Sequence, residues 1–408
     1  MIRVNDLSRK SFLFSLLLCW LLVAGCRDPF VPEIEGFESL LVVEGRLTTD
    51  TTGSTILLSN SYGFGGDTLI PVSDANVKII DETGIEYLLA EKVPGQYCSD
   101  PALFLPEAGQ SYQLQIRTSA GRSYVSDWQL LKATPGIDRL EPELFTQANV
   151  NGEQLEGARF LLDAQSVNEE ASYFLWTYRE TWEFFTPYLK RAEWIWDPEP
   201  RVQRLPYDEE VNHCWRQAAS TEIILGTTRD ISGNKVADFP IHTVNVKSDK
   251  VNWGYVLQVQ QYSISEEEYS FLNTIRQNTE TTGSIFDPVP GEIVGNIRCV
   301  DDPSQPVIGY FSASEVSEAM AYINRDFFPD SVRTTDALNY CDLDTIFFNS
   351  GSREAVLATL RSRTEQGGFT YLDTAFQVLT PVGFKLAPKE CADCKLTGTP
   401  VKPSFWPN

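Results

Sequence analysis

Short segments that alternate apolar and polar side chains recur through the first third of the chain and predict β-strands. Ala75–Ile80 and Tyr112–Arg117 alternate, while Leu40–Glu44 and Thr55–Leu58 are rich in aliphatic and β-branched residues. A period of two is typical of strands with one buried face. Turn residues separate the segments at regular spacing, which predicts an antiparallel sandwich ending near Thr134–Gly136.

A longer region, from about Ile137 to Pro388, shows the same strand-like pattern. Its clearest strands are expected at Phe160–Asp163, Tyr173–Tyr178, Glu222–Leu225 and Trp253–Tyr262. The pattern predicts a second, larger β-sandwich-like domain.

Two helices are expected within this region. Ser265 and Glu268 have the spacing of a capping box, and the apolar residues behind them recur at helical spacing. Gly351-Ser352 precedes a second helix at Arg353–Arg363, whose apolar stripe is formed by Val356, Leu357 and Leu360.

The first residues predict an exported lipoprotein. Arg3, Arg9 and Lys10 precede an apolar run, Ser11–Val23, of about 13 residues, shorter than the roughly 20 residues of a spanning helix. Val23-Ala24-Gly25-Cys26 resembles the bacterial lipobox, which implies acylation of Cys26. The alternative is an ordinary signal peptide with an incidental cysteine. Residues 26–39 are expected to be a tether.

The formal net charge of −23 argues against nucleic acid as a partner, because lysine and arginine carry affinity for phosphates. It also argues against electrostatic docking on anionic lipid. Solubility is the favoured interpretation of this charge, with ordered cation binding as the alternative. Aromatic residues at 12% and hydrophobic residues at 42% are typical of a packed, globular chain.

Eight cysteines in an exported chain favour disulfides over metal ligation. Cys391 and Cys394 are expected to be oxidised, either to each other or to Cys341 or another thiol. A zinc site would need more ligands than the spacing offers, so no metal or cofactor is expected. The disulfide candidates are Cys391, Cys394, Cys341, Cys299 and Cys214.

Ten aromatic residues lie between Tyr173 and Trp196, and several share one strand face. Aromatic faces form either a sandwich core or a surface for ligands and partners, and both interpretations stay open. Arg179, Glu180 and Glu183 are expected to face water. The binding candidates are Trp176, Tyr178, Trp182, Trp194 and Trp196.

No catalytic residue is predicted, since the chain contains no nucleophile elbow, zinc-protease motif or phosphate-binding loop. His213 is expected in a turn and His242 in a strand. An acidic chain always offers two carboxylates, so a glycan or peptide hydrolase is the least favoured alternative. Asp301-Asp302 or Asp342 with Asp344 would suit calcium, but a solvated loop is the favoured interpretation.

Three groups of motifs together resemble a domain-of-unknown-function family of Bacteroidota outer-membrane lipoproteins. They are Val42–Leu47 with Pro71–Val77, Gly95–Tyr97 and Ala108–Tyr112; Thr282–Pro288 with Gly295–Ile297 and Val307–Ser314; and Cys391–Cys394 with Lys402–Trp406. Members are typically encoded beside SusC-like TonB-dependent transporters. The first domain also resembles immunoglobulin-like, carboxypeptidase-regulatory-type sandwiches.

The resemblance implies a lipid-anchored outer-membrane protein, expected at the cell surface, although Arg27–Phe30 offers a single acidic residue for surface export. The expected function is non-enzymatic ligand capture for the transporter. The alternative is an independent adhesin or envelope protein. The expected divisions are 1–25 signal peptide, 26–39 tether, 40–136 immunoglobulin-like sandwich, 137–388 larger β-rich domain and 389–408 cysteine-containing tail.

Overall fold

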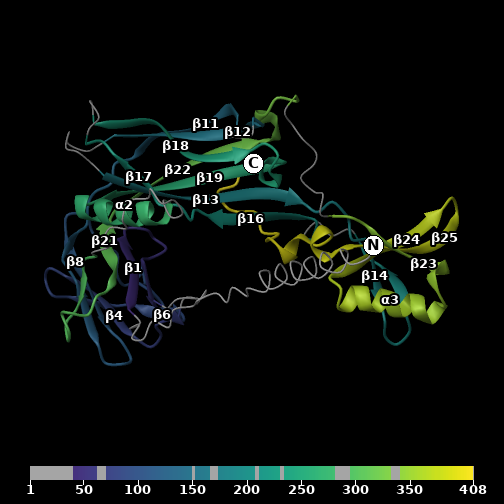
Figure 1. Cartoon of the computed structure of the whole chain (residues 1–408), viewed down its shortest axis with the longest axis horizontal. Helices are drawn as coiled ribbons and strands as arrows, with labels where there is room; N and C mark the ends of the chain where they lie inside the picture. Colours follow the sequence, from purple (N-terminus) through teal and green to yellow (C-terminus); the bar gives the residue numbers. More distant parts are fainter. Residues whose placement is uncertain are drawn as a thin grey trace, which may run out of the picture. The chain divides into compact units, whose positions relative to one another are not determined.

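The computed structural model describes residues 40–61, 70–148, 152–165, 173–206, 211–229, 234–280, 295–331 and 341–407 (Figure 1). The expected signal peptide, Cys26 and the tether lie outside these ranges. Within them the chain is mainly β, as predicted, and no helix is long and apolar enough to cross a bilayer.

Two sheets with a shared apolar core form the first sandwich. Alternation along the strands turns Val43, Ile56, Val77 and Leu114 into this core, where each is fully buried. One sheet has the order β21-β1-β2-β7-β6, with β3 beside β2, and the other β20-β9-β8-β4-β5, with β10 beside β8. The strands are β1 (Leu41–Thr48), β2 (Thr55–Asn60), β3 (Ile70–Pro71), β4 (Asn76–Asp81), β5 (Glu86–Leu88), β6 (Ala90–Val93), β7 (Gln96–Cys98), β8 (Ser111–Arg117), β9 (Ser123–Ser126), β10 (Gln129–Leu130), β20 (Ile297–Cys299) and β21 (Ile308–Ser314).

Strands β20 and β21 belong to the first sandwich although they come much later in the sequence than its other strands. β21 pairs with β1 in parallel, and β20 pairs with β9. Ile297 and Phe311 complete the apolar core. The expected division at residue 136 therefore omits part of this sandwich, because a strand's local pattern predicts its buried face and not its partner.

A second pair of sheets forms the middle sandwich. One sheet has the order β11-β12-β18 and the other β16-β13-β19-β22, with β17 also beside β13. Phe160, Trp176 and Leu257 are fully buried between them. The strands are β11 (Ile137–Ala148), β12 (Gln154–Gln165), β13 (Tyr173–Phe185), β16 (His213–Ala219), β17 (Ile224–Thr227), β18 (Lys235–Asn245), β19 (Gly254–Ile264) and β22 (Val316–Asn324).

Helix α2 (Glu266–Glu280) begins where the capping box predicts. The Glu268 amide donates to Ser265 Oγ at 3.0 Å. The Glu268 carboxylate accepts a hydrogen bond from Arg46 of β1, so this pair links the helix to the first sandwich. Phe271 adds an apolar contact with Tyr310 of β21, with ring centroids 5.3 Å apart.

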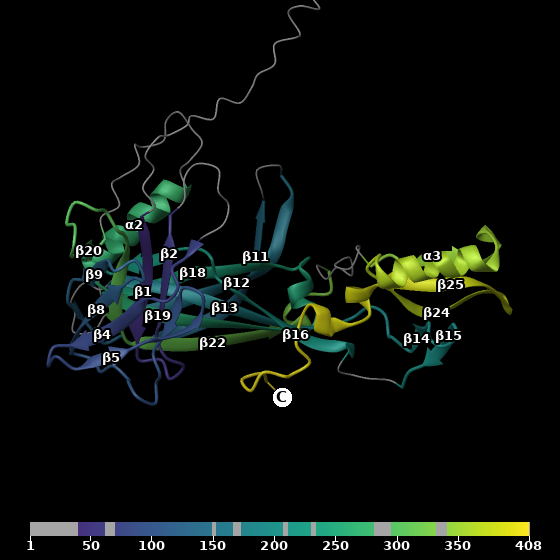
Figure 2. The same ribbon diagram turned by 90° about the horizontal axis from the view of Figure 1, so that it is seen from below.

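A small C-terminal unit combines a sheet of order β23-β25-β24, the hairpin β14-β15 and helix α3 (Figure 2). The hairpin is contributed by residues that precede the unit's other strands by more than a hundred positions. Leu360 of α3 and Leu386 of β25 are fully buried in its core. Its elements are β14 (Ala192–Ile195), β15 (Arg201–Arg204), β23 (Asp344–Phe347), α3 (Arg353–Glu365), β24 (Phe369–Gln377) and β25 (Thr380–Pro388).

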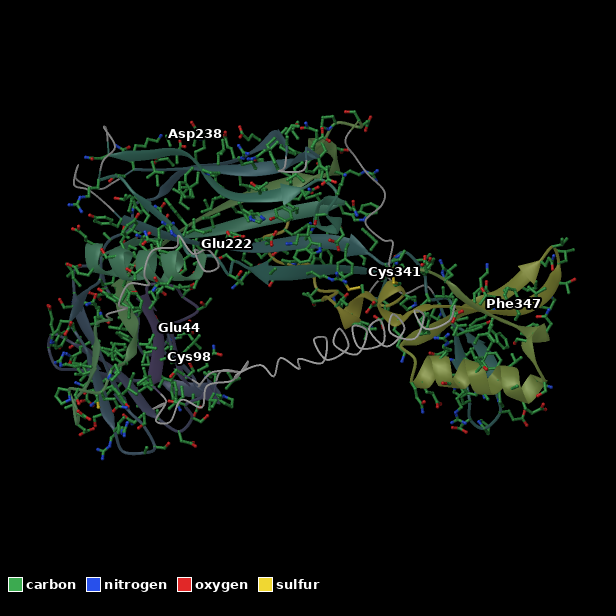
Figure 3. All side chains as sticks on the ribbon, viewed as in Figure 1. Glu44, Cys98, Glu222, Asp238, Cys341 and Phe347 are labelled. Carbon is green, nitrogen blue, oxygen red and sulfur yellow. A yellow bond between two sulfur atoms is a disulfide. The ribbon has the colours of Figure 1, made fainter. Side chains whose placement is uncertain are left out.

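Two disulfides hold the cysteine-containing tail (Figure 3). Cys214 of β16 is bonded to Cys394, and Cys341 to Cys391. Trp406 of the tail packs with Trp215 of β16. The short helices are η2 (Asp249–Val251), η3 (Arg325–Phe327), η4 (Phe348–Ser350), η5 (Lys389–Cys391) and η6 (Cys394–Leu396).

Of the five disulfide candidates, Cys299 is a free thiol, which corrects that prediction. It is buried in the core of the first sandwich, where β20 pairs with β9. Cys98 is also free and lies on β7. Both disulfides lie elsewhere, at the junction of the tail with β16 and with the segment before β23.

Candidate functional site

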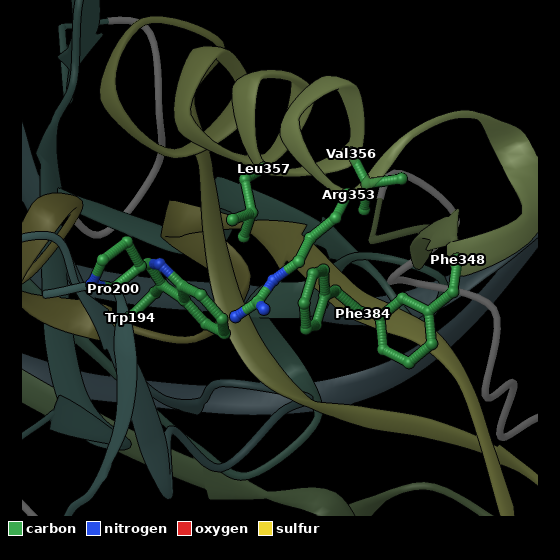
Figure 4. Close-up of a pocket in the computed structure, with 7 residues that line it drawn as sticks. All are labelled: Trp194, Pro200, Phe348, Arg353, Val356, Leu357 and Phe384. Atoms are coloured by element: carbon green, nitrogen blue, oxygen red, sulfur yellow. The ribbon is translucent and has the colours of Figure 1, made fainter.

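A pocket of about 310 Å³ opens in the C-terminal unit (Figure 4). This volume is at the lower end of the range typical of small-molecule sites. Its walls are built by the β14-β15 hairpin, by β25, by α3 and by the short helix η4 (Phe348–Ser350) that precedes α3. The lining residues are Trp194, Pro200, Phe348, Arg353, Val356, Leu357 and Phe384.

Helix periodicity explains why three residues of α3 reach the same pocket. Ser352 caps the helix by accepting a hydrogen bond from the Ala355 amide at 3.3 Å, which makes Arg353 the first helical residue. Val356 and Leu357 follow Arg353 by three and four positions, so all three lie on one face. One face of α3 therefore supplies an apolar wall and a cation.

The ring of Trp194 is fixed by other aromatic side chains. Its centroid lies 4.9 Å from that of Phe384 and 5.8 Å from that of Tyr371, both in edge-on geometry. Its indole nitrogen Nε1 is buried and has no hydrogen-bond partner among the described residues. The indole Nε1 atoms of Trp182 and Trp215 are likewise buried without a partner, so this state does not by itself mark Trp194 as a ligand contact.

Arg353 is the only charged residue among the seven that line the pocket. Figure 4 shows its guanidinium directed between the rings of Trp194 and Phe384. Within the described parts of the chain, no carboxylate lies within salt-bridge distance of it. An exposed arginine at the mouth of an apolar pocket leaves its positive charge available to a ligand.

Three of the five predicted binding residues lie in the core of the middle sandwich. Trp176, Tyr178 and Trp182 point from β13 toward the opposite sheet and are at most 9% exposed. Trp176 also donates from Nε1 to Gln261 Oε1 at 2.8 Å inside the core. The idea of an exposed recognition surface is therefore wrong for these three residues, because the sandwich buries the face that they share.

The other two predicted residues, Trp194 and Trp196, lie together in the C-terminal unit. Their ring centroids are 5.7 Å apart, and both are partly buried. Trp196 is covered by the guanidinium of Arg361, at 5.4 Å from the ring centroid. Trp194 is thus the one predicted residue that lines the pocket.

Sequence reasoning missed Arg353, Phe348 and Phe384 as site residues. Arg353 was expected only as the start of a helix, and nothing in its local pattern relates it to Trp194. The expected apolar stripe of α3, with Val356 and Leu357, was the available indication that this face packs against something.

Glu180 does not face water as expected but lies among the aromatic residues of β13. Its carboxylate accepts hydrogen bonds from Tyr255 OH at 2.8 Å and Lys250 Nζ at 2.6 Å, and pairs with His242 Nε2 at 3.1 Å. Burial raises the pKa of Glu180, but these hydrogen bonds outweigh burial and lower it to about 2. The side chain is 6% exposed, so we interpret the network as structural.

The second histidine also pairs with a glutamate of β13. His213 Nε2 lies 2.6 Å from Glu183 Oε1, at the start of β16 rather than in the expected turn. Among the residues that the structure describes, no three histidine, cysteine or acidic side chains come close enough to hold a metal ion.

The fold and the pocket define a mainly β protein of two sandwiches with a small-molecule-sized pocket in its C-terminal unit. The chain belongs to the family described as domain of unknown function DUF4249, whose model matches residues 27–319. No curated protein matches the chain. The matched residues include Trp194 but end before Arg353 and Phe384, so the completed pocket lies partly outside them.

Proposed function

We propose that this protein is an outer-membrane lipoprotein of the Bacteroidota that captures a ligand for a SusC-like TonB-dependent transporter without catalysing a reaction. The observation that carries ligand capture is the pocket of the C-terminal unit, where aromatic walls surround a single arginine. Pockets of this kind, mostly apolar with a few placed polar groups, are typical of small-molecule recognition.

The first residues support the proposed location. The lipobox-like Val23-Ala24-Gly25-Cys26 follows an apolar run too short to span a membrane. Lipid on Cys26 would hold the sandwiches at a membrane surface. The association with a transporter rests on the family resemblance of the motifs that end in Cys391–Cys394 and Lys402–Trp406.

A genetic experiment separates this proposal from an independent adhesin. Strains lacking the lipoprotein, the expected neighbouring transporter, or both should show the same loss of uptake, because the two proteins act in one step. An additive defect in the double deletion, or attachment to surfaces that survives loss of the transporter, would favour the adhesin instead.

Catalytic turnover of a substrate would distinguish a hydrolase from both a transporter partner and an adhesin. Purified protein should release no product from glycans or peptides. Turnover that is lost on substitution of a single carboxylate would overturn the non-enzymatic part of the proposal.

A further inference from the structure

The hydrogen-bonding chemistry of the pocket indicates what kind of ligand it takes. Among the seven lining side chains the guanidinium of Arg353 is the exposed donor, and none of the seven carries an oxygen or other strong acceptor. A neutral sugar presents hydroxyl groups but no negative charge to pair with Arg353. A ligand group that only accepts hydrogen bonds fits this set.

The positive charge of Arg353 also favours a ligand group that only accepts hydrogen bonds. The guanidinium of Arg353 is directed between the rings of Trp194 and Phe384, and no carboxylate of the described residues lies within salt-bridge distance of it, although it attracts the Glu354 carboxylate at longer range. Glu354, the next residue of α3, does not line the pocket, and adjacent helix positions face different directions. A planar guanidinium binds a carboxylate through two parallel hydrogen bonds.

The apolar walls of the pocket indicate the shape and polarity of the rest of the ligand. Trp194, Phe384 and Phe348 offer ring surfaces, and Val356 and Leu357 complete an apolar lining. Flat rings, and sugar rings with an apolar face, both stack on such surfaces.

We propose that this pocket binds a small organic carboxylate whose body is a flat or apolar-faced ring, with the carboxylate held by Arg353 and the ring packed on Trp194 and Phe384. This inference rests on the proposed ligand-capture role and names its ligand class. Two kinds of compound, an aromatic acid and a sugar acid, carry such a carboxylate on a ring.

Calorimetric titration of the mature chain with two matched pairs tests the proposal: phenylacetate against phenylacetamide, and glucuronate against glucose. At least one carboxylate should bind more tightly than its neutral counterpart. Arg353→Gln should weaken that binding by about tenfold or more, because it removes a charged hydrogen-bonding partner.

The control is Arg361→Gln, on the same helix but over Trp196 rather than in the pocket, which should leave the affinity unchanged. The NMR signal of the Trp194 indole N–H should shift with the carboxylate and not with the neutral compound, which reports binding independently of affinity. The pair that shows the preference distinguishes an aromatic acid from a sugar acid.

The proposal is overturned if none of the four compounds binds, if the neutral compounds bind as well as the acids, or if Arg353→Gln retains the preference. None of these outcomes bears on the transporter, whose recovery with the lipoprotein is measured without ligand. Conversely, a clear preference for the acids without any associated transporter would overturn the proposed function and leave the ligand class intact.

Discussion

At the residue scale, the carboxylate of Glu180 is held ionised inside the middle sandwich. Its folded-state pKa, about 2, lies below the 4.5 of an ordinary glutamate. The stabilisation is therefore complete above pH 4.5 and is lost as the pH falls toward 2. A shift of this size corresponds to about 3 kcal/mol.

Denaturation of the wild type and of Glu180→Gln at several pH values between 6 and 2 measures this contribution. The variant should be less stable at pH 6, because Lys250 and His242 lose their partner, and should lose less stability on acidification. Glu141→Gln, at a 68% exposed side chain, should follow the wild type. Parallel pH profiles for all three proteins would contradict the role given to Glu180.

Trp182 makes a second residue-scale prediction. It is 7% exposed in the core of the middle sandwich, and the Lys250 ammonium lies 5.0 Å from its ring centroid. Trp182→Ala should reduce the free energy of unfolding by about 3–5 kcal/mol. Trp128→Ala, at a 48% exposed position, should change it by less than about 0.5 kcal/mol. Equal stability of the two variants in denaturant titrations would show that Trp182 is not a core residue.

At the element scale, we predict that two disulfides attach the C-terminal tail to β16 and to the segment before β23. Non-reducing peptide mapping of the exported protein should recover Cys214 linked to Cys394 and Cys341 linked to Cys391. Cys98 and Cys299 should react as free thiols after unfolding. A peptide with Cys391 linked to Cys394, which the sequence left open, would contradict this arrangement.

The sequence predicted the positions of strands and helices more completely than it predicted which strands pair with each other. The expected strands at Ala75–Ile80 and Tyr112–Arg117 and both helices are present, because burial of one face sets a local period. The parallel pairing of β1 with β21 joins segments more than two hundred residues apart, and no local pattern specifies it.

The same limit explains what was missed at the site. Trp194 was predicted as a binding residue from the density of aromatic residues around it, but its pocket is completed by Arg353 and Phe384 from distant elements. Glu180 was expected to face water as one of the charged residues between the aromatic ones, but it shares the parity of Trp176 and Trp182 and so lies on the same buried face of β13. Its burial depends on donors from η2, β18 and β19, which the sequence of β13 does not contain.

At the scale of the whole molecule, we predict that attachment of the protein to the membrane depends on the sulfur atom of Cys26. Cys26→Ser removes the thiol that would be acylated, and acyl chains supply membrane affinity at roughly 0.8 kcal/mol per buried methylene. Cell fractionation should find the variant soluble or uncleaved. A variant that stays in the outer membrane with unchanged gel mobility would show that Cys26 is not the anchor.

We infer that this chain works as a non-enzymatic partner of a transporter. The decisive measurement is the amount of transporter that co-purifies with the tagged lipoprotein from native outer membranes, under conditions that preserve complexes. We predict that a TonB-dependent transporter is recovered with the wild type far above its recovery with an unrelated tagged lipoprotein. Recovery of no transporter above that background would show that the chain does not form a stable complex with one.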